Sequence, residues 1–130
     1  MTAKDSKLYV TEIVAGILSN LPQEKSQLST ELRKIHPILL NLKDSCPNTL
    51  GDIVFDLRGT FAYSEEIEQA FSNLETAMIL PRRNPELNHY EITDKLRDYF
   101  KKYVENKLNA EQSAEIKKIA SKMETIASAN

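Results

Sequence analysis

The residues that could act as nucleophiles or metal ligands are few and far apart in this chain. The histidines are His36 and His89, and the single cysteine, Cys46, lies ten residues beyond His36. No pair has the spacing of a zinc site. A Cys46–His36 pair could in principle generate a reactive thiolate, but a small buried or half-buried cysteine is the preferred interpretation. We therefore predict no catalytic residue and no metal ligand.

The glycines and the clustered acids do not add a ligand site. Gly16, Gly51 and Gly59 stand too far apart to form a glycine-rich loop around a phosphate. The three glutamates within residues 65–68 could hold a cation, but carboxylates at a helix start are favoured by the helix dipole alone. We expect no enzyme activity, no cofactor and no small-molecule ligand.

The helix around which the rest of the chain is organised is expected between Ser64 and Leu80. Its apolar residues recur at the i, i+3, i+4, i+7 spacing of one buried stripe. They are Ile67, Ala70, Phe71, Leu74, Ala77 and Met78. Ser64 is a suitable N-cap, and the glutamates that follow it suit the first turn. The helix should end near Leu80, because Pro81 disfavours helical geometry at the residue before it.

A short hairpin and another helix are expected next. The segment 81–86, PRRNPE, contains two prolines and cannot continue a helix. Tyr90, Glu91 and Ile92 restore the apolar–polar alternation of a half-buried strand. Thr93 then caps the next helix. The apolar face of that helix comprises Leu96, Tyr99, Phe100, Tyr103 and Val104.

Three runs follow one another here: LETAMIL from Leu74, RRNPE from Arg82 and YEITDK from Tyr90. Together they resemble the passage from recognition helix to wing in the winged-helix superfamily. Met78 stands where that pattern commonly has glycine, so the turn lacks a freely left-handed residue. The resemblance covers roughly 30 of the 130 residues and implies an architecture rather than an activity. We therefore predict a mostly α chain with a winged-helix-like core, a short β-hairpin and additional N- and C-terminal helices.

Two helical stretches are expected before this core. Lys7 to Leu21 has the apolar spacing of an amphipathic helix and ends at Pro22. Gln23 to Asp44 is predicted as a second helical stretch. It should be kinked, or broken and restarted, near His36, because Pro37 removes one hydrogen bond and clashes with the preceding turn.

The segment from Leu50 to Phe61 admits two interpretations. Ile53, Phe55 and Leu57 alternate with other residues in the manner of a strand. We prefer a short strand that pairs with the hairpin, because a winged helix normally places one early strand there. A helical turn from Thr49 to Leu57 is the alternative.

A last helix is expected within residues 109–130, a helical extension of a single domain spanning residues 1–130. Asn109 and Gln112 have the form of a capping box. One face of this helix is our candidate contact surface for a protein partner or a second copy of the chain. It comprises Ile116, Ile119, Met123 and Ile126. The alternative is that this face packs on Leu8 to Leu21 within one chain.

The composition is that of an ordinary globular protein, with 41% hydrophobic and 28% charged residues. A net charge of −2 and an isoelectric point near 5.7 predict no bulk attraction to nucleic acid or to acidic membranes. Met1 to Asn20 contains no long apolar run, so neither a signal peptide nor a membrane span is predicted. The lone Cys46 fits a reducing compartment, and we expect a cytoplasmic protein.

Nucleic-acid binding is the main alternative function. Winged-helix proteins commonly place the helix that corresponds to residues 64–80 of this chain in the major groove of DNA, and the wing in the minor groove. Gly59 to Pro81, however, contains four glutamates and no lysine or arginine, a net charge of −4. Phosphate neutralisation supplies most non-specific DNA affinity, so duplex DNA should repel this helix. The candidate contacts of this alternative lie on the wing: Arg82, Arg83, Asn84 and His89.

The end of the chain has the opposite sign of charge. Thr93 to Asn130 carries eight basic and six acidic residues, a net charge of +2, with i, i+4 pairs such as Asp98 and Lys102. The acidic middle and the basic end suggest complementarity between two copies or between the chain and a partner. We predict a non-enzymatic protein–protein interaction module, or a small subunit of a larger cytosolic assembly. The alternative is a winged-helix DNA-binding transcriptional regulator.

Overall fold

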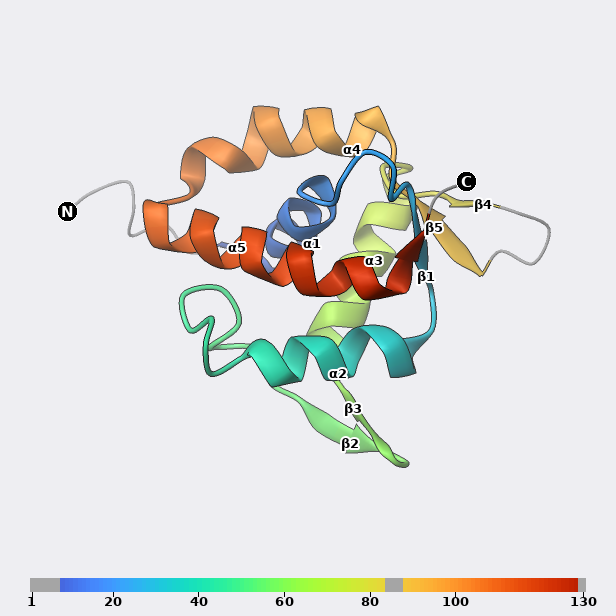
Figure 1. The fold of residues 1–130 in the computed structure, drawn as a ribbon, viewed down its shortest axis with the longest axis vertical. Coiled ribbons are helices and arrows are strands. Elements are labelled where there is room, and N and C mark those ends of the chain that lie inside the picture. Colours follow the sequence, from blue (N-terminus) through green and yellow to red (C-terminus); the bar gives the residue numbers. More distant parts are fainter. Residues whose placement is uncertain (1–7, 84–87, 129–130) are drawn as a thin grey trace.

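The computed structural model describes residues 8–83 and 88–128, which form a mostly helical chain with a small antiparallel sheet (Figure 1). The α-helices are α1 (Val10–Ser19), α2 (Leu32–Leu42), α3 (Glu65–Thr76), α4 (Asp94–Tyr99) and α5 (Ala110–Met123). Helix α4 continues as the π-helix η2 (Phe100–Val104) and the 3-10 turn η3 (Glu105–Lys107), and α5 as the 3-10 turn η4 (Glu124–Ile126). The strands are β1 (Gln27–Ser29), β2 (Asp56–Arg58), β3 (Phe61–Tyr63), β4 (Arg82–Arg83), β5 (His89–Glu91) and β6 (Ala127–Ser128).

Helix α1 lies at the centre of the helices, and its prediction is confirmed. It packs against α3, α4, η2 and α5, and its residues from Glu12 to Leu18 are all buried (Figure 1). Gly16 allows two of these neighbours to approach closely. A Cβ atom at this position would lie 3.1 Å from Cε1 of Phe100 and 3.2 Å from Cδ1 of Ile116. Glycine therefore suits this helix crossing in spite of its poor helix propensity.

The four-stranded sheet joins segments that are distant in the sequence, in the order β4–β5–β1–β6, with antiparallel neighbours. Leu28 of β1 lies opposite Tyr90 of β5, and both are buried. The prediction that this part of Gln23 to Asp44 is helical is wrong. The backbone instead bonds across the sheet, as the hydrogen bond from Ile92 N to Ser26 O (2.7 Å) illustrates, and the helix begins only at Leu32.

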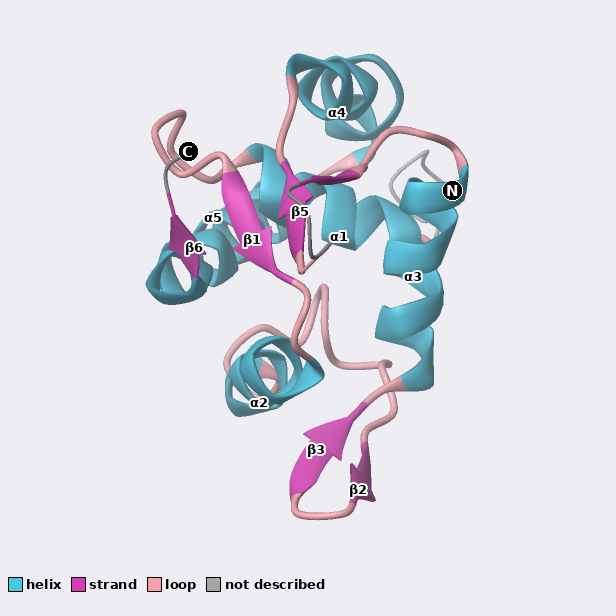
Figure 2. Cartoon of the chain, turned by 90° about the vertical axis from the view of Figure 1, so that its right-hand side faces the viewer, coloured by secondary structure: helices cyan, strands magenta, loops and turns pink. Residues whose placement is uncertain are grey.

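The segment from Leu50 to Phe61 contributes a strand, but not with the expected partner. Strand β2 pairs with β3, Leu57 lying opposite Ala62, and β1 occupies the place beside β5. Gly59 lies in the turn between β2 and β3 with a φ of 65°, a value that glycine adopts at little cost. The β2–β3 hairpin projects beyond the helices (Figures 1 and 2).

Helix α2 runs without interruption from Leu32 to Leu42 with Pro37 inside it, so of the two alternatives expected near His36 the break and restart does not form. The proline removes only its own bond to the carbonyl four residues earlier, that of Arg33. That carbonyl lies in the first turn of α2, and the rest of the helix is anchored by Ile35, Leu39 and Leu42, which are buried.

Helix α5 and its capping box between Asn109 and Gln112 are confirmed, but the contact surface predicted on it is wrong. Ile116, Ile119 and Met123 are each at most 1% exposed, because they face the core where α5 packs against α1 and α2. Ile126 is partly buried against the same core. The alternative, that this face packs within one chain, is therefore correct.

Helix α3 begins as predicted, with Ser64 as the N-cap that accepts a hydrogen bond from Ile67 N, and it buries Ile67, Ala70, Phe71 and Leu74. It ends at Thr76, before Leu80, because Met78 reverses the chain with a φ of 63°.

Two hydrogen bonds close this helix end, from Met78 N to Glu75 O (2.9 Å) and from Ile79 N to Leu74 O (2.9 Å). Together they form a Schellman motif. A methionine thus adopts the left-handed conformation for which glycine is the usual residue.

Replacing Met78 by glycine should therefore stabilise the protein. A residue with a side chain pays roughly 1–2 kcal/mol to adopt the left-handed conformation, and glycine avoids this cost. Glycine also gives the unfolded chain more conformational freedom, which cancels part of the gain in stability. Met78 is 73% exposed, so little packing is lost. We expect Met78→Gly to raise the free energy of unfolding in urea by about 0.5–1 kcal/mol.

The neighbouring Ala77 provides the control, because its φ of −76° needs no glycine. Ala77→Gly should lower stability by about 0.5–1 kcal/mol. If both substitutions lower it equally, the assigned role of the left-handed turn is wrong.

Candidate functional site

The outer face of α3 presents mainly uncharged polar groups. Glu65, Gln69, Ser72 and Thr76 are exposed on the side opposite the buried stripe. Their spacing of three and four residues places them on one face. A single carboxylate at the start of the helix is therefore the only charged group of this face.

The other three glutamates of α3 are engaged by groups of the same chain. Oε1 of Glu66 accepts a hydrogen bond from Val54 N (2.9 Å). Oε2 of Glu68 lies 3.3 Å from Nε2 of His36, and Oε2 of Glu75 lies 3.0 Å from Nε of Arg82. Of these contacts only the one with Arg82 offsets a carboxylate charge, and the other two satisfy Glu66 and Glu68 with hydrogen bonds.

Arg82, a predicted nucleic-acid contact, is turned back toward α3. Besides pairing with Glu75, its guanidinium carbon lies 5.3 Å from the centroid of the Tyr90 ring. Tyr90 in turn stacks on Phe71 of the α3 core, with ring centroids 5.0 Å apart. Arg82 thus links the hairpin β4–β5 to α3 and carries little uncompensated charge. We call the outer face of α3 and the β4–β5 hairpin the α3–hairpin surface.

The remaining predicted contacts lie along the same hairpin. Arg83 is in β4, opposite His89 of β5. Nδ1 of His89, a half-buried residue, is 2.7 Å from Oδ1 of Asn88. Asn84 lies outside the described residues. Arg82, Arg83 and His89 therefore lie on one pair of strands, and their role in nucleic-acid contact stays a prediction.

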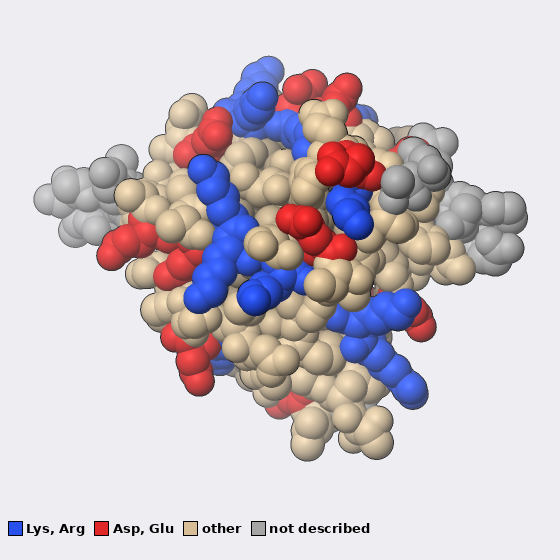
Figure 3. Space-filling view, viewed as in Figure 1, with Lys and Arg blue, Asp and Glu red and all other residues tan. Residues whose placement is uncertain are grey.

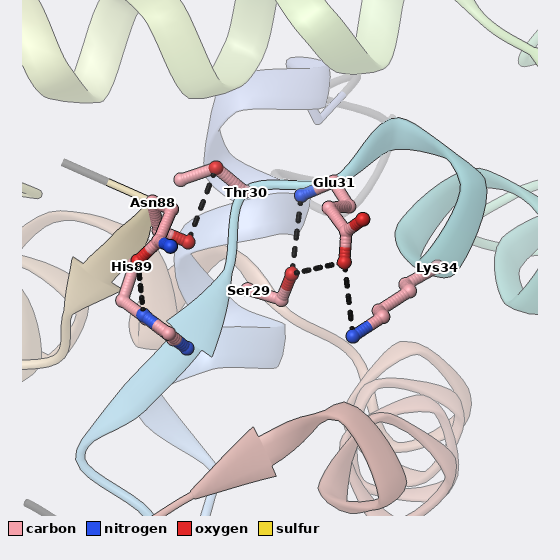
Figure 4. A network of polar contacts seen from close by, with 6 residues as sticks. All are labelled: Ser29, Thr30, Glu31, Lys34, Asn88 and His89. Carbon is pink, nitrogen blue, oxygen red and sulfur yellow. Dashed lines mark hydrogen bonds and ion pairs between the residues drawn. The ribbon is translucent and has the colours of Figure 1, made fainter. Parts of the chain in front are cut away.

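A polar network missed by the sequence analysis joins this hairpin to the start of α2 (Figure 4). The backbone N and Oγ1 of Thr30 donate to Asn88 O at 3.1 and 3.2 Å. On the other side of β1, Lys34 Nζ lies 2.9 Å from Oε2 of Glu31, and this ammonium group lowers the pKa of the Glu31 carboxyl. The positive charge of Lys34, like that of Arg82, is paired with a carboxylate of the chain.

The sequence analysis also missed the role of His36, whose ring is fully buried. Its Nδ1 accepts a hydrogen bond from Ser64 N (2.9 Å), so the proton of the neutral ring is on Nε2, facing Glu68. The ring stacks on Tyr63 with centroids 5.1 Å apart. His36 thereby joins α2 to the start of α3. Its place next to Ile35 on the buried stripe of α2 was the one signal that could have pointed to this.

His36 and Cys46 do not form an activated nucleophile pair. Both ring nitrogens of His36 are engaged by Ser64 and Glu68, and neither contacts Cys46. Cys46 is buried, and its burial raises the pKa of the thiol, which disfavours the reactive thiolate. Within residues 8–83 and 88–128, no three His, Cys, Asp or Glu side chains form a group that could hold a metal ion.

The cavity beside the start of α1 gives little reason to expect a small ligand. A cavity of about 470 Å³ lies between the start of α1 and residues 47–53. Its polar groups include Asn48, which donates to Glu115 at 2.7 Å, and Glu66, which is bound to Val54 N. These groups serve the chain itself.

Comparison of the chain with protein-family models, with curated proteins and with solved structures gives no match. Among the helices in the described part of the chain, none combines the length and apolar character needed to cross a lipid bilayer. What the α3–hairpin surface does must therefore be inferred from its own chemistry.

The contacts of His36 lead to a stability prediction. His36→Ala should lower the free energy of unfolding by about 2–4 kcal/mol, because it leaves Ser64 N without its acceptor and opens a cavity. His36→Asn keeps an acceptor near the position of Nδ1 and should lose less, as measured by urea denaturation. Equal losses for the two variants would show that the bond to Ser64 contributes nothing.

The burial of Tyr90 predicts a loss of stability at alkaline pH. Burial raises the pKa of Tyr90 to about 12 in the folded chain, against about 10 for an exposed tyrosine. Since the folded value is the higher one, the stabilisation is complete below pH 10 and is lost between about pH 10 and 12, at a total of about 2–3 kcal/mol.

Urea denaturation across this pH range should therefore show a shallower decline for Tyr90→Phe than for the natural chain. Tyr103→Phe is the control, because Tyr103 is 57% exposed and its substitution should leave the decline unchanged. An identical decline in all three proteins would contradict the assignment.

Proposed function

We propose that this chain is a non-enzymatic protein-interaction module, or a small subunit of a larger assembly, built on a winged-helix-like scaffold. Support for the scaffold comes from the order of elements α1, β1, α2, α3, β4 and β5. In the sheet, β5 lies between its hairpin partner β4 and the early strand β1. The β2–β3 hairpin between α2 and α3 is an addition to that scheme.

One observation carries the choice of a protein partner over DNA. Arg82, a cation of the β4–β5 hairpin, is held by Glu75 at 3.0 Å. A protein that binds duplex DNA gains most of its non-specific affinity by neutralising phosphates with free cations. A paired arginine contributes less to that term, because the phosphate must compete with a carboxylate that is already in place.

The charge on the rest of α3 favours the same choice. Its outer face has Glu65 at one end and no lysine or arginine between Ser64 and Pro81. Lys34, at the start of α2, is paired with Glu31. Protein interfaces tolerate such paired charges at their rim. A surface that binds a phosphate backbone would instead require an excess of positive charge.

Exposed apolar side chains supply the other half of a protein interface. Leu57 on the β2–β3 hairpin is 80% exposed, Val54 is 61% exposed, and Met78 at the end of α3 is 73% exposed. Methionine and large apolar groups on projecting elements suit contact with another protein, because their burial on binding releases water.

The DNA-binding regulator is the second candidate, and one observation favours it. Gln69, Ser72 and Thr76 are exposed on one face of α3, and amide and hydroxyl groups can hydrogen-bond to base edges in the major groove. The turning of Glu66, Glu68 and Glu75 toward the chain also reduces the repulsion expected from the sequence.

Titration of a fluorescently labelled duplex, followed by anisotropy at low and at physiological salt, separates the two functions. We expect a dissociation constant no tighter than about 100 µM at physiological salt. Glu75→Gln, which frees Arg82, should tighten binding only a few-fold at low salt, and Arg82→Ala should change nothing. Tight binding that Arg82→Ala and Arg83→Ala weaken would establish the regulator instead.

The protein-interaction function requires a positive result as well. The tagged chain, purified from its native cells, should retain one partner in stoichiometric amount, and Leu57→Lys should lose it. Thr60→Lys is a matched control, because it adds the same charge to the same hairpin at a residue that is already polar and exposed. Loss of the partner in both variants would show a charge effect rather than a contact by Leu57.

A further inference from the structure

Helix α4 and the π-helix η2 form a continuous helical element with a free outer side (Figure 1). Its inner side carries Leu96, Phe100 and Val104, which are buried toward α1. The exposed residues of the outer side are Asp94, Lys95, Asp98, Lys101, Lys102 and Tyr103. Both signs of charge lie along this upper edge of the molecule (Figure 3).

The change from α-helix to π-helix decides which residues face outward. Tyr103 was predicted on the buried face with Tyr99 and Phe100, but it is 57% exposed. A π-helix has more residues per turn than an α-helix, since its bonds join residues five apart. The wider turn keeps Phe100 and Val104 inward and turns Tyr103 toward solvent.

The same change separates the charges that the sequence pattern would pair. Asp98 and Lys102 are four residues apart, but the structure gives no ion pair between them, because the four-residue stacking of an α-helix is lost in η2. Asp94 and Lys101 likewise form no ion pair with any residue in the described part of the chain.

The unpaired charges are separated along the element. Asp94 and Asp98 lie in its first half, with Lys95 between them, and Lys101 and Lys102 lie in its second half. The exposed charges sum to −1 in the first half and to +2 in the second half, so this face complements a copy of itself turned end to end. A two-fold axis produces this antiparallel arrangement, since it places the same surface on both sides of the interface.

We propose that a second copy of this chain binds to the outer side of α4 and η2, antiparallel, with the aspartates of each copy facing Lys101 and Lys102 of the other. This inference deepens the proposed function, on which it rests, by naming one partner. The interface is isologous, so each ionic contact occurs twice.

An aromatic patch lies beside the lysines at the η2 end of this face. The rings of Tyr99 and Tyr103 are 5.6 Å apart, and Lys102 Nζ lies 5.5 Å from the Tyr103 ring. Tyr9, 70% exposed, extends the patch through Lys107, whose Nζ is 5.4 Å from its ring. Tyrosine is among the residues that contribute most to protein interfaces, because it buries a large ring at a small entropic cost.

The size of the face predicts a weak dimer. One helical face buries less than the roughly 800 Å² per partner of a standard interface, so we expect a dissociation constant on the order of 10 µM. Sedimentation of the natural chain from about 5 to about 500 µM should therefore show a monomer–dimer equilibrium that high salt weakens.

A charge exchange tests the arrangement itself. Lys101→Glu/Lys102→Glu leaves Lys95 as the one base among four acids on the face, and Asp94→Lys/Asp98→Lys makes the face entirely basic. Each variant alone should sediment as a monomer, its dissociation constant weakened by more than about tenfold. A mixture of the two should form a heterodimer, because both contact zones then join opposite charges. Its formation also shows that both variants fold.

Lys117→Glu/Lys118→Glu is the matched control, because these lysines are exposed on α5 and lie outside the proposed interface. It should dimerise like the natural chain. A natural chain that stays monomeric at all concentrations, or variants that are folded by circular dichroism and stay monomeric when mixed, would overturn the dimer. The proposed function would then still be judged by the DNA and partner experiments, which use neither variant.

Discussion

The antiparallel pairing of β1 with β5 is the contact on which the arrangement of the chain depends. It joins the segment that follows α1 to the segment that follows α3, with Leu28 and Tyr90 buried opposite each other. The pairing orients the β4–β5 hairpin, and Tyr90 then stacks on Phe71 and lies under Arg82. The relation of the hairpin to α3 therefore follows from one short ladder of backbone hydrogen bonds.

The glutamates of α3 and the arginine of the neighbouring hairpin contact groups of the same chain. The carboxylates that form a cluster in the sequence contact specific partners: Glu66 a backbone amide, Glu68 His36 and Glu75 Arg82. The ion pair with Glu75 neutralises Arg82, a cation that a DNA-binding hairpin would use. The outer face of α3 is polar and carries no basic residue, which suits a protein partner better than a polyanion.

The outer side of α4 and η2 differs from that surface, because its charges are separated instead of paired. The cause is local: a π-helical turn shifts the residues after Tyr99 relative to those before it. One change in helical geometry therefore both exposes Tyr103 and leaves the lysines and aspartates unpaired. The interaction chemistry proposed for this face thus originates in the backbone conformation.

The sequence by itself determined the features that depend on neighbours along the chain. These were α1, the start of α3 at Ser64, the capping box of α5 and the strand at Tyr90, because caps and periodicity act within a few residues. Only the tertiary structure decided that Leu28 lies in a strand, that Ile119 is in the core and that Arg82 meets Glu75. Each of these features depends on which distant segment packs next to the residue in the folded chain. The local pattern of residues does not specify that segment.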